Sequence, residues 1–308
     1  MIEKNKNFNG TWPFQANFCG AAGFQQHYID EGQSDREVLI CLHGEPTWGY
    51  LYRKMISKLS EFYRVIVPDH MGFGKSETPQ TRRYTLETHV ENLEILIEEL
   101  DLKSITFVGQ DWGGPIAGAY ALRNPDRVAR FCLMNTLLGY SGPLPNSEKT
   151  PWFKWIEKQE NSKTLNGILG ELGSSLLSVM QLLGFERLSN VDQNWIDAYS
   201  SAFPDRQSCL GAIAFPLDIH YGHCKKFIVS SLKTGNLDKI KKKPSMLVEG
   251  MKDRAIHPEN AIADFKAIWP NGPVIKLYQA GHFCQEDSPE VLIALIHQFI
   301  QMTPMRDI

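Results

Sequence analysis

Apolar residues occur along the first half of this chain in short, uninterrupted runs. Each run ends at glycine or at a polar loop, which is the pattern of strands buried on both faces of a sheet. An earlier segment, FQQHYIDEG, alternates apolar and polar positions instead, and the first 20 or so residues are expected to be irregular. The pattern predicts strands at 24–32, at 38–44, from 64 into a Gly-rich loop ending at 74, at 104–110 and at 127–135.

Segments with helical spacing separate these strands. Apolar residues three and four positions apart predict an amphipathic helix over 88–102. The small, Ala-rich segment 111–125 predicts a closely packed helix that stops before Pro125. Because strands alternate with helices, we expect an α/β protein with a mostly parallel central sheet and helices on both faces.

The alternation breaks after Asn135 and returns only near residue 244. The segment 137–218 contains five prolines and several short amphipathic stretches but no convincing strand. Strands are predicted again at 244–253 and 273–282, followed by a terminal helix at 288–300. We therefore expect a helical insertion, which would lie over the carboxyl ends of the strands, where open α/β sheets bind ligands.

This pattern divides the chain into two predicted parts. Residues 1–136 and 219–308 would form the core domain, and residues 137–218 would form a helical lid, or cap, inserted after the sixth strand. A length of 308 residues fits one large domain with such an insertion. The composition, 43% hydrophobic and 22% charged, is that of a globular protein.

Charge and targeting signals narrow the expected surroundings. A net charge of −3 argues against binding to nucleic acid, which requires concentrated positive charge. No apolar run reaches membrane-spanning length, and MIEKNKNFNG lacks the apolar core of a signal peptide. We therefore expect a cytoplasmic protein with no nucleic-acid or membrane partner. The six cysteines form no C-x-x-C pair, so we expect reduced thiols.

The motif most specific for chemistry is Gly109-Gln110-Asp111-Trp112-Gly113. It has the spacing of a nucleophile elbow, G-x-S-x-G, between a predicted strand and a predicted helix, with aspartate replacing serine. The alternative for Asp111 is an ordinary helix N-cap. A carboxylate is ionised at neutral pH and needs no base to attack. Since attack on saturated carbon gives a stable ester, Asp111 suggests displacement at such a carbon.

An ester intermediate must then be hydrolysed, which requires a base. His282 follows the last predicted strand, in the chain order nucleophile, acid, histidine, and a histidine can activate water. Asp253, in GMKDR after the preceding strand, is the expected acidic partner; Glu249 and Asp264 are placed less well. The other customary position for the acid holds Asn135, which has no carboxylate.

Two further segments predict anion-binding groups. His43-Gly44-Glu45-Pro46 follows an early strand, where the backbone N–H of Glu45, together with that of Trp112, would form an oxyanion hole. The indole N–H of Trp112 is a donor suited to an anionic leaving group, although core packing is the alternative for a tryptophan here. The lid supplies two more tryptophans, Trp152 and Trp155.

Taken together, these motifs resemble the haloalkane dehalogenases, a family of the α/β-hydrolase superfamily. Among them, HGEP with QDWGG and a late aspartate resembles the subfamily that holds halide with two tryptophans. The segments that carry the resemblance are HGEPTWGYLYRKMI (43–56), VPDHMGFGKS (67–76), GQDWGG (109–114), AYSSAFPD (198–205), GMKD (250–253) and AGHFCQED (280–287).

The resemblance implies an α/β-hydrolase fold and a role for each motif residue. It makes Asp111 the nucleophile, His282 the base and Asp253 its partner. Trp112 would donate to the halide, and Glu45 would contribute its backbone N–H while its side chain helps to position the water. The second halide donor would be a lid tryptophan: gap-free counting from Trp112 favours Trp152, whereas the local F-x-W pattern favours Trp155.

The implied reaction is the hydrolysis of a haloalkane to an alcohol, halide and a proton, a detoxification reaction. The expected partners are a small apolar halogenated substrate, water and the halide ion, with no metal and no organic cofactor. The chain is expected to be a monomer or homodimer. The lid lacks the family's LPTG-like opening after residues 134–136, so the resemblance does not define the substrate range.

Several other functions stay open at this point. An epoxide hydrolase shares the nucleophile and would need two lid tyrosines, for which Tyr140 and Tyr199 are available. A β-lactone-processing or luciferase-like relative also uses aspartate here. A haloacid substrate is disfavoured because residues 112–115 contain no arginine. A non-catalytic binding protein of this fold would not need Asp111, His282 and Asp253 together.

Two remaining clusters have plainer interpretations. His220, His223 and Cys224 are loosely spaced like metal ligands but have no evident fourth partner. The run Lys239–Lys243, broken by Ile240, is interpreted as a solvated surface before a strand and not as a membrane anchor.

Overall fold

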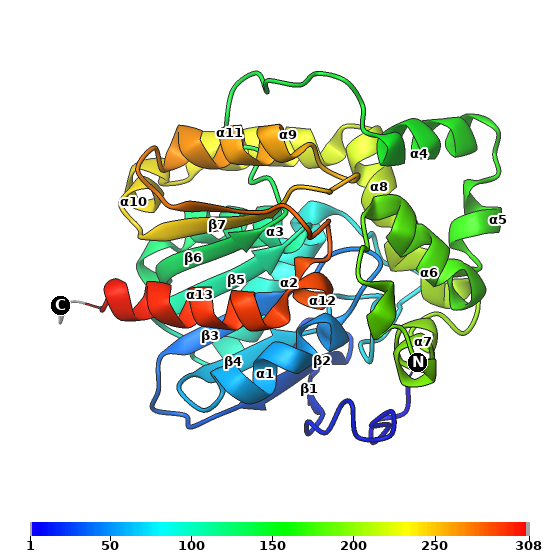
Figure 1. The fold of residues 1–308 in the computed structure, drawn as a ribbon, viewed down its shortest axis with the longest axis horizontal. Helices are drawn as coiled ribbons and strands as arrows, with labels where there is room; N and C mark the ends of the chain where they lie inside the picture. The colour runs from blue at the N-terminus through cyan, green and yellow to red at the C-terminus, as the bar shows by residue number, and fades with distance from the viewer. Residues whose placement is uncertain (1, 306–308) are drawn as a thin grey trace.

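The computed structural model describes residues 2–305, and its centre is an eight-stranded sheet (Figure 1). The strand order is β1-β2-β4-β3-β5-β6-β7-β8; β2 pairs antiparallel with both β1 and β4, and all other neighbouring strands are parallel. The expected mostly parallel sheet is therefore confirmed. The strands are β1 Asn17–Cys19, β2 Gln26–Glu31, β3 Val38–Leu42, β4 Arg64–Pro68, β5 Ile105–Gln110, β6 Val128–Met134, β7 Ser245–Gly250 and β8 Val274–Leu277.

The strands follow the apolar runs closely. Every residue of β3, β5 and β7 is buried, because helices cover both faces of the parallel part of the sheet. The largest difference is at β8, which ends at Leu277 although the pattern predicted a strand to 282. A turn closed by the N–H of Ala280 on the carbonyl of Leu277 diverts the chain into a loop before His282.

The prediction that the first 20 residues are irregular was wrong at one point. Asn17–Cys19 form the edge strand β1, which pairs antiparallel with Gln26–Tyr28 of β2. The strand is three residues long, and all three residues are half-buried. So short a segment has no apolar periodicity to detect, and its pairing is decided by the neighbouring strand.

The helices lie on both faces of the sheet and at one end of it (Figure 1). Helix α2 begins after Thr85, whose side chain accepts from the N–H of Thr88, and α3 ends at Arg123, before Pro125 as predicted. The helices of the sheet faces are α1 Arg53–Leu59, α2 Leu86–Glu99, α3 Gly113–Arg123, α9 His223–Thr234, α10 Leu237–Lys241, α11 Pro258–Ile268, α12 Cys284–Asp287 and α13 Pro289–Met302.

Of the seven α-helices between β6 and β7, the first five form the lid and lie together at the right in Figure 1. They are α4 Pro151–Asn161, α5 Leu165–Leu169, α6 Leu172–Leu183, α7 Gln193–Ser200 and α8 Leu210–His220. Helix α9, which follows, packs against α2 and α3 of the core as well as against α8. The predicted lid boundary at residue 218 falls inside the last turn of α8.

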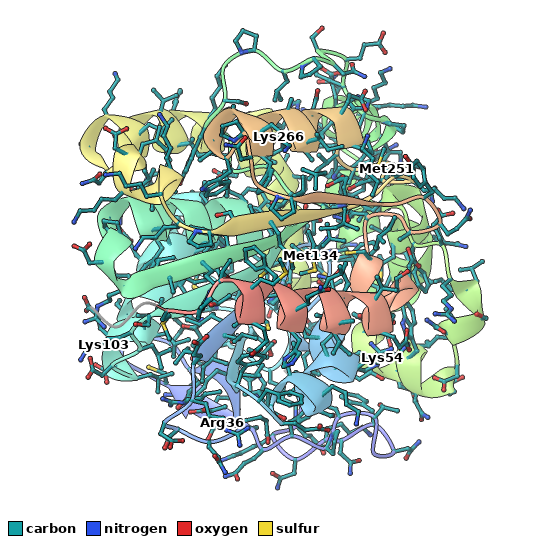
Figure 2. All side chains as sticks on the ribbon, turned by 60° about the vertical axis from the view of Figure 1, so that its left-hand side comes forward. Arg36, Lys54, Lys103, Met134, Met251 and Lys266 are labelled. Atoms are coloured by element: carbon teal, nitrogen blue, oxygen red, sulfur yellow. The ribbon has the colours of Figure 1, made fainter. Side chains whose placement is uncertain are left out.

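Side chains separate into an apolar interior and a charged exterior (Figure 2). Met134, at the end of β6, is buried between the sheet and its covering helices, whereas Lys103 projects from the rim of the molecule. Within residues 2–305 we find no helix that combines the length and the apolar character required to cross a membrane.

Candidate active site

Asp111 lies on a sharp turn between β5 and α3. Its φ angle is +51°, in the left-handed region that side chains rarely adopt, so the turn stores local strain. The glycine two residues on makes this turn possible, because a Cβ on Gly113 would lie 2.2 Å from the carbonyl oxygen of Leu42 in β3. The helix can approach the sheet only without that side chain. The sequence therefore produces the elbow that its glycine spacing predicted.

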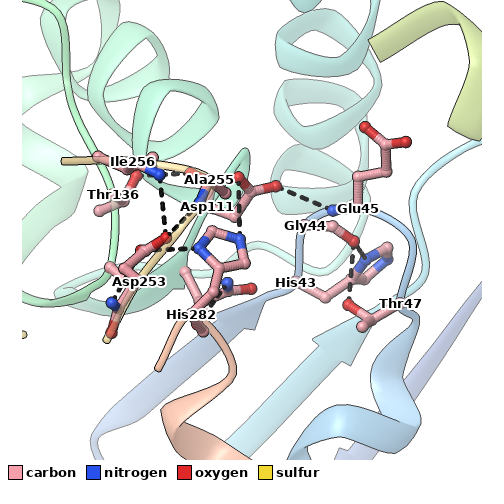
Figure 3. Close-up of polar contacts among 12 residues, drawn as sticks. His43, Gly44, Glu45, Thr47, Asp111, Thr136, Asp253, Ala255, Ile256 and His282 are labelled. Carbon is pink, nitrogen blue, oxygen red and sulfur yellow. Dashed lines mark hydrogen bonds and ion pairs between the residues drawn. The ribbon is translucent and has the colours of Figure 1, made fainter. Parts of the chain in front are cut away.

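The Asp111 carboxylate meets groups from two other loops (Figure 3). Its Oδ1 accepts a hydrogen bond from the backbone N–H of Glu45 at 2.9 Å. Its Oδ2 lies 3.4 Å from Nε2 of His282, a distance of an ion pair that is longer than an ordinary hydrogen bond. The Asp111 side chain is 15% exposed, so one part of the carboxylate remains open to a substrate.

His282 and Asp253 form a buried acid–base pair. Nδ1 of His282 lies 2.8 Å from Oδ2 of Asp253, and both side chains are fully buried. The other Asp253 oxygen accepts from the backbone N–H groups of Ala255 and Ile256, at 2.7 and 2.9 Å. These two N–H groups fix the orientation of the Asp253 carboxylate, which in turn orients the His282 ring.

The charges around His282 set its protonation. Burial lowers the pKa of His282, but the carboxylates of Asp253 and Asp111 outweigh this effect and raise the pKa to about 10. At neutral pH the imidazole is therefore an imidazolium that is paired with carboxylates on both sides. A resting histidine of this kind is a proton donor and not a base.

Asn135 and Glu249 belong to this cluster, although the sequence analysis gave them no part in it. The Nδ2 of Asn135 donates to Oδ2 of Asp253 at 2.9 Å and lies 3.3 Å from Oε1 of Glu249. Burial, with the charge of Asp253, raises the pKa of Glu249 well above its ordinary value. The signal was Asn135 itself, which directly follows β6, the neighbour of β7 in the sheet.

Gln110 was also missed as a functional residue. Its Nε2 donates to the backbone carbonyl of His282 at 3.1 Å and so connects β5 to the loop that carries His282.

Asp264, which was considered as an alternative acid, instead stabilises a loop of the lid. It accepts from the N–H groups of Leu138, Gly139 and Ser141 and holds the segment that leads into α4.

The Glu45 side chain is buried beside the nucleophile. The residue is 4% exposed, and its Oε1 has no hydrogen-bond partner among residues 2–305. Burial raises the pKa of Glu45 well above its ordinary range, and the nearby Asp111 charge acts in the same direction. The raised pKa favours the protonated form of the carboxyl group, whose O–H can donate a hydrogen bond.

The three candidate tryptophans lie in two stacked pairs. Trp112 is parallel to Phe215 of lid helix α8, with ring centroids 4.2 Å apart and planes 9° apart. Trp152 and Trp155 stack on each other within α4, at 5.3 Å and 14°. Trp152 is buried, at 3% exposure, and Trp155 is half-buried. Since α4 packs against α8, Trp152 is the better candidate to face the same space as Trp112.

Other candidate residues lie away from this arrangement. The Tyr199 hydroxyl donates to Oε1 of Glu286 at 2.7 Å, and the Tyr140 hydroxyl is buried against Gly118 of α3. His223 is exposed and lies 3.6 Å from Asp218. Within the described part of the chain, no group of three or more histidine, cysteine or acidic residues could hold a metal ion.

Comparison with known proteins gives three similarities that span most of the chain. Residues 37–289 match the model of the alpha/beta hydrolase fold family. A haloalkane dehalogenase of Psychrobacter cryohalolentis is 33% identical, over 90% of this chain and 88% of that protein. A cis-3-alkyl-4-alkyloxetan-2-one decarboxylase of Xanthomonas campestris is 31% identical, over 92% and 94%.

A solved structure is similar along almost the same length. The tetrameric haloalkane dehalogenase DpaA of Paraglaciecola agarilytica has a TM-score of 0.74 and 31% identity, over 92% of each chain. Its assembly is a property of that protein. The expectation that the present chain is a monomer or homodimer stays a prediction.

Proposed function

This chain belongs to the haloalkane dehalogenase family of the α/β-hydrolases, and from that premise we propose that it hydrolyses haloalkanes through a covalent ester on Asp111. The observation that supports this most is the position of the Asp111 carboxylate. One oxygen accepts from the N–H of Glu45, while His282 and Asp253 stand in line behind the other. In a serine hydrolase the histidine first removes the proton of the serine hydroxyl. A carboxylate at this position can attack without that help.

In the first step, the Asp111 carboxylate attacks the carbon that bears the halogen. A carbon–oxygen bond forms, the carbon–halogen bond breaks, and halide leaves with the bonding electrons. His282 takes no proton in this step, so its protonated resting state does not prevent the displacement. The 15% exposure of the Asp111 side chain provides the open face that the substrate needs.

Ester formation changes the charge that His282 meets. The ester of Asp111 is neutral, and one of the two carboxylates that raise the pKa of His282 is then lost. The pKa of the imidazole therefore falls, which favours the neutral base that the second step needs. Asp253 remains hydrogen-bonded to Nδ1 and orients the ring.

In the second step, His282 removes a proton from a water molecule that attacks the ester carbonyl. The developing oxyanion would be held by the backbone N–H groups of Glu45 and Trp112. When this intermediate collapses, the bond from the carbonyl carbon to the alkoxide oxygen breaks, and the His282 imidazolium returns its proton to that oxygen to give the alcohol. The carboxylic acid left on Asp111 then passes its proton to His282, which restores the resting pair. The buried carboxyl group of Glu45 lies beside this site and would help to position the water.

The halide would be stabilised by two indole N–H groups, one from the core domain and one from the lid. Trp112 follows the nucleophile, and its stacking on Phe215 joins the nucleophile helix to α8. We assign the second donor to Trp152 on the basis of its burial in α4. In this proposal, residues 137–218 form the lid domain, residues 1–136 and 219–308 form the core domain, and substrate range depends on the lid.

The first experiment is a halide-release assay with 1-bromobutane, 1-iodobutane and 1,2-dibromoethane. We expect release by the unmodified protein and none by Asp111→Ala. Circular dichroism of both proteins controls for folding. Absence of release by a folded, unmodified protein on every substrate would exclude the proposal for simple haloalkanes.

The second candidate function is the opening of a β-lactone, and the similarity to the Xanthomonas decarboxylase favours it. An oxetan-2-one is a strained four-membered lactone, so an ionised carboxylate such as Asp111 can open it. A cis-3,4-dialkyl oxetan-2-one offered to the protein would then yield carbon dioxide and an alkene. Gas chromatography of the alkene distinguishes this reaction from dehalogenation.

The structure gives less support to an epoxide hydrolase. That chemistry needs two tyrosine hydroxyls aimed at the substrate oxygen. The hydroxyl of Tyr199 instead donates to Glu286, which is also paired with Arg53. Tyr199 would have to leave a buried charged partner in order to polarise an epoxide.

A further inference from the structure

A lid segment touches both loops that bear the acid–base pair. We call residues 183–187, which begin at the last residue of α6, the strap. The carbonyl of Leu183 accepts from the backbone N–H of Arg254, one residue after Asp253, at 2.9 Å. The Arg254 guanidinium also donates to Oε1 of Glu186 at 2.6 Å. The strap is therefore bonded to the Asp253 loop through both backbone and side chain.

The strap meets the His282 loop by backbone contact between two glycines. A Cβ on Gly281 would lie 2.1 Å from the carbonyl oxygen of Gly184. A Cβ on Gly184, whose φ is +124°, would lie 3.0 Å from the backbone nitrogen of His282. Gly281 has no room for a side chain, and one on Gly184 would be both tight and strained, so the strap and the His282 loop are in close backbone contact.

Asp287 fastens this contact. One carboxylate oxygen accepts from the N–H groups of Glu186 and Arg187 in the strap, at 3.2 and 2.8 Å. The other oxygen accepts from the N–H of Gly281, the residue before His282, at 2.8 Å. Asp287 is 7% exposed, so these hydrogen bonds are shielded from water. A single carboxylate thus joins the strap to the histidine loop.

The neighbouring carboxylate of α12 holds a different part of the lid. Glu286 accepts from Tyr199 of α7 and pairs with Arg53, and Nζ of Lys54 lies 3.9 Å from its carboxylate. None of these contacts involves the backbone of residues 281–282. The two adjacent acids therefore have different partners. Glu286 holds α7 of the lid, whereas Asp287 holds the loop that carries His282.

We propose that Asp287 is a positioning residue for His282, and that it acts by clamping residues 183–187 of the lid against Gly281. The inference rests on the proposed function, because it assumes that His282 activates the water of the second step. Loss of the clamp leaves Asp111 and its open face unchanged, so alkylation proceeds as before. Hydrolysis slows, because the imidazole is no longer held at the correct distance from the water.

The test is a single-turnover comparison of the unmodified protein with Asp287→Asn. The asparagine keeps the shape of the side chain but offers only one acceptor oxygen to the N–H groups on the two sides. Rapid quenching with excess protein over 1-bromobutane gives two rate constants, halide release for the first step and alcohol formation for the second. We expect halide release within about twofold of the unmodified protein and alcohol formation slowed by about tenfold or more.

A matched control is Asp126→Asn, an exposed acid paired with Lys239 on the surface, which should change neither rate constant. Because the ester decays in a first-order step whose rate constant does not depend on the active fraction, partial misfolding alone would not slow alcohol formation selectively. Intact-mass measurement should also show the butylated protein accumulating in Asp287→Asn. Equal slowing of both steps, or no change in either, would overturn the proposal.

A second variant approaches the clamp from the lid side. Gly184→Ala places a methyl group against the backbone of His282, and the same selective slowing of alcohol formation is expected. If Asp287→Asn does not fold, this variant decides the question by the same two rate constants. Failure of the proposed function itself would look different, since the unmodified protein would then release no halide.

Discussion

The catalytic edge of the sheet and the lid above it are held together in different ways. Asp111, Asp253 and His282 follow β5, β7 and β8, which are members of one parallel sheet with continuous backbone hydrogen bonding. The lid helices instead reach the core mainly through individual buried side chains. Tyr199 bonds to Glu286, and the indole of Trp48 donates to the carbonyl of Ala198 in α7 at 3.1 Å.

Residues at the sheet edge and residues that hold the lid should therefore affect different properties of the protein. The geometry of the nucleophile and the acid–base pair comes from the sheet, so substitutions there should abolish a chemical step. The position of the lid depends on a few carboxylates that accept several hydrogen bonds each, such as Asp264, Glu286 and Asp287. Substitutions in the lid should therefore change halide affinity, stability or the rate of one step.

The largest effect should come from Asp111→Ala, which removes the nucleophile of the sheet edge. Without it no ester can form, and halide release should fall by on the order of 10⁴-fold or more. Halide release from 1-iodobutane at saturating substrate measures this loss. Residual release above one hundredth of the original rate would show that a different group attacks the carbon.

The next largest effect is expected for His282→Gln, which removes only the base. Turnover should fall by about 10²–10⁴-fold, because water attack on the ester loses general-base assistance. One equivalent of halide per protein should still be released, and the alkylated protein should persist. Mass spectrometry of the reaction mixture detects that adduct, and its absence would contradict the assignment of His282 to the second step.

Trp152→Phe tests the lid side of the comparison. Loss of an indole donor to a charged group costs about 1.5–3 kcal/mol, so halide affinity should weaken by about tenfold or more. Trp155→Phe is the matched control, because Trp155 is the half-buried member of the same stacked pair. The inhibition constant of bromide, measured as a product inhibitor, gives the halide affinity of both variants. A larger effect at Trp155 would reverse the assignment of the second donor.

The pH dependence of stability tests the charge cluster at the sheet edge. The pKa of His282 is raised from 6.5 to about 10 in the folded protein, so its pairing with Asp253 and Asp111 stabilises the fold fully below pH 6.5. This contribution is lost as the pH rises through about 10. The difference in Tm between the unmodified protein and His282→Gln should therefore shrink steadily from pH 6.5 to pH 10. A difference that is constant with pH would contradict the raised pKa.

The smallest effect is expected for Tyr199→Phe, which removes one anchor of α7. A hydrogen bond to a buried carboxylate contributes about 1.5–3 kcal/mol. In a protein of this size that corresponds to a decrease in Tm of a few degrees. Tyr221→Phe is the matched control, since that exposed tyrosine donates to Glu160 on the surface and should have almost no effect. Equal decreases would show that Glu286 is not a special anchor.

Local motifs predicted several residues that the structure brings together at the edge of the sheet. Asp111 was predicted because two glycines and the flanking strand and helix are adjacent in the chain, and His282 because it follows the last strand. Their catalytic roles stay predictions. Asn135, Glu249 and Asp287 were not assigned a function, because their partners lie in other loops. Asn135 meets Asp253 across 118 residues, a contact created by the pairing of β6 with β7.

For the lid, the sequence predicted the position in the chain but not the packing of its side chains. Its helical character and its place after the sixth strand were predicted from the prolines and the missing strand pattern, and the sheet topology agrees with that placement. The spacing of Trp152 and Trp155 did not identify which of them is buried. That choice depends on how α4 packs against α5, α6 and α8, which periodicity within one helix does not describe.

The sequence by itself determined the alternation of strands and helices, the elbow at Asp111 and the order of Asp111, Asp253 and His282 after successive strands. These depend on neighbouring residues, because glycine spacing and apolar periodicity act over a few positions. Only the tertiary structure decided which carboxyl groups have raised pKa values, which lid tryptophan is buried and how Asp287 joins the strap to Gly281. These depend on burial and on distances between loops far apart in the chain, and both arise only when the sheet and the lid are assembled.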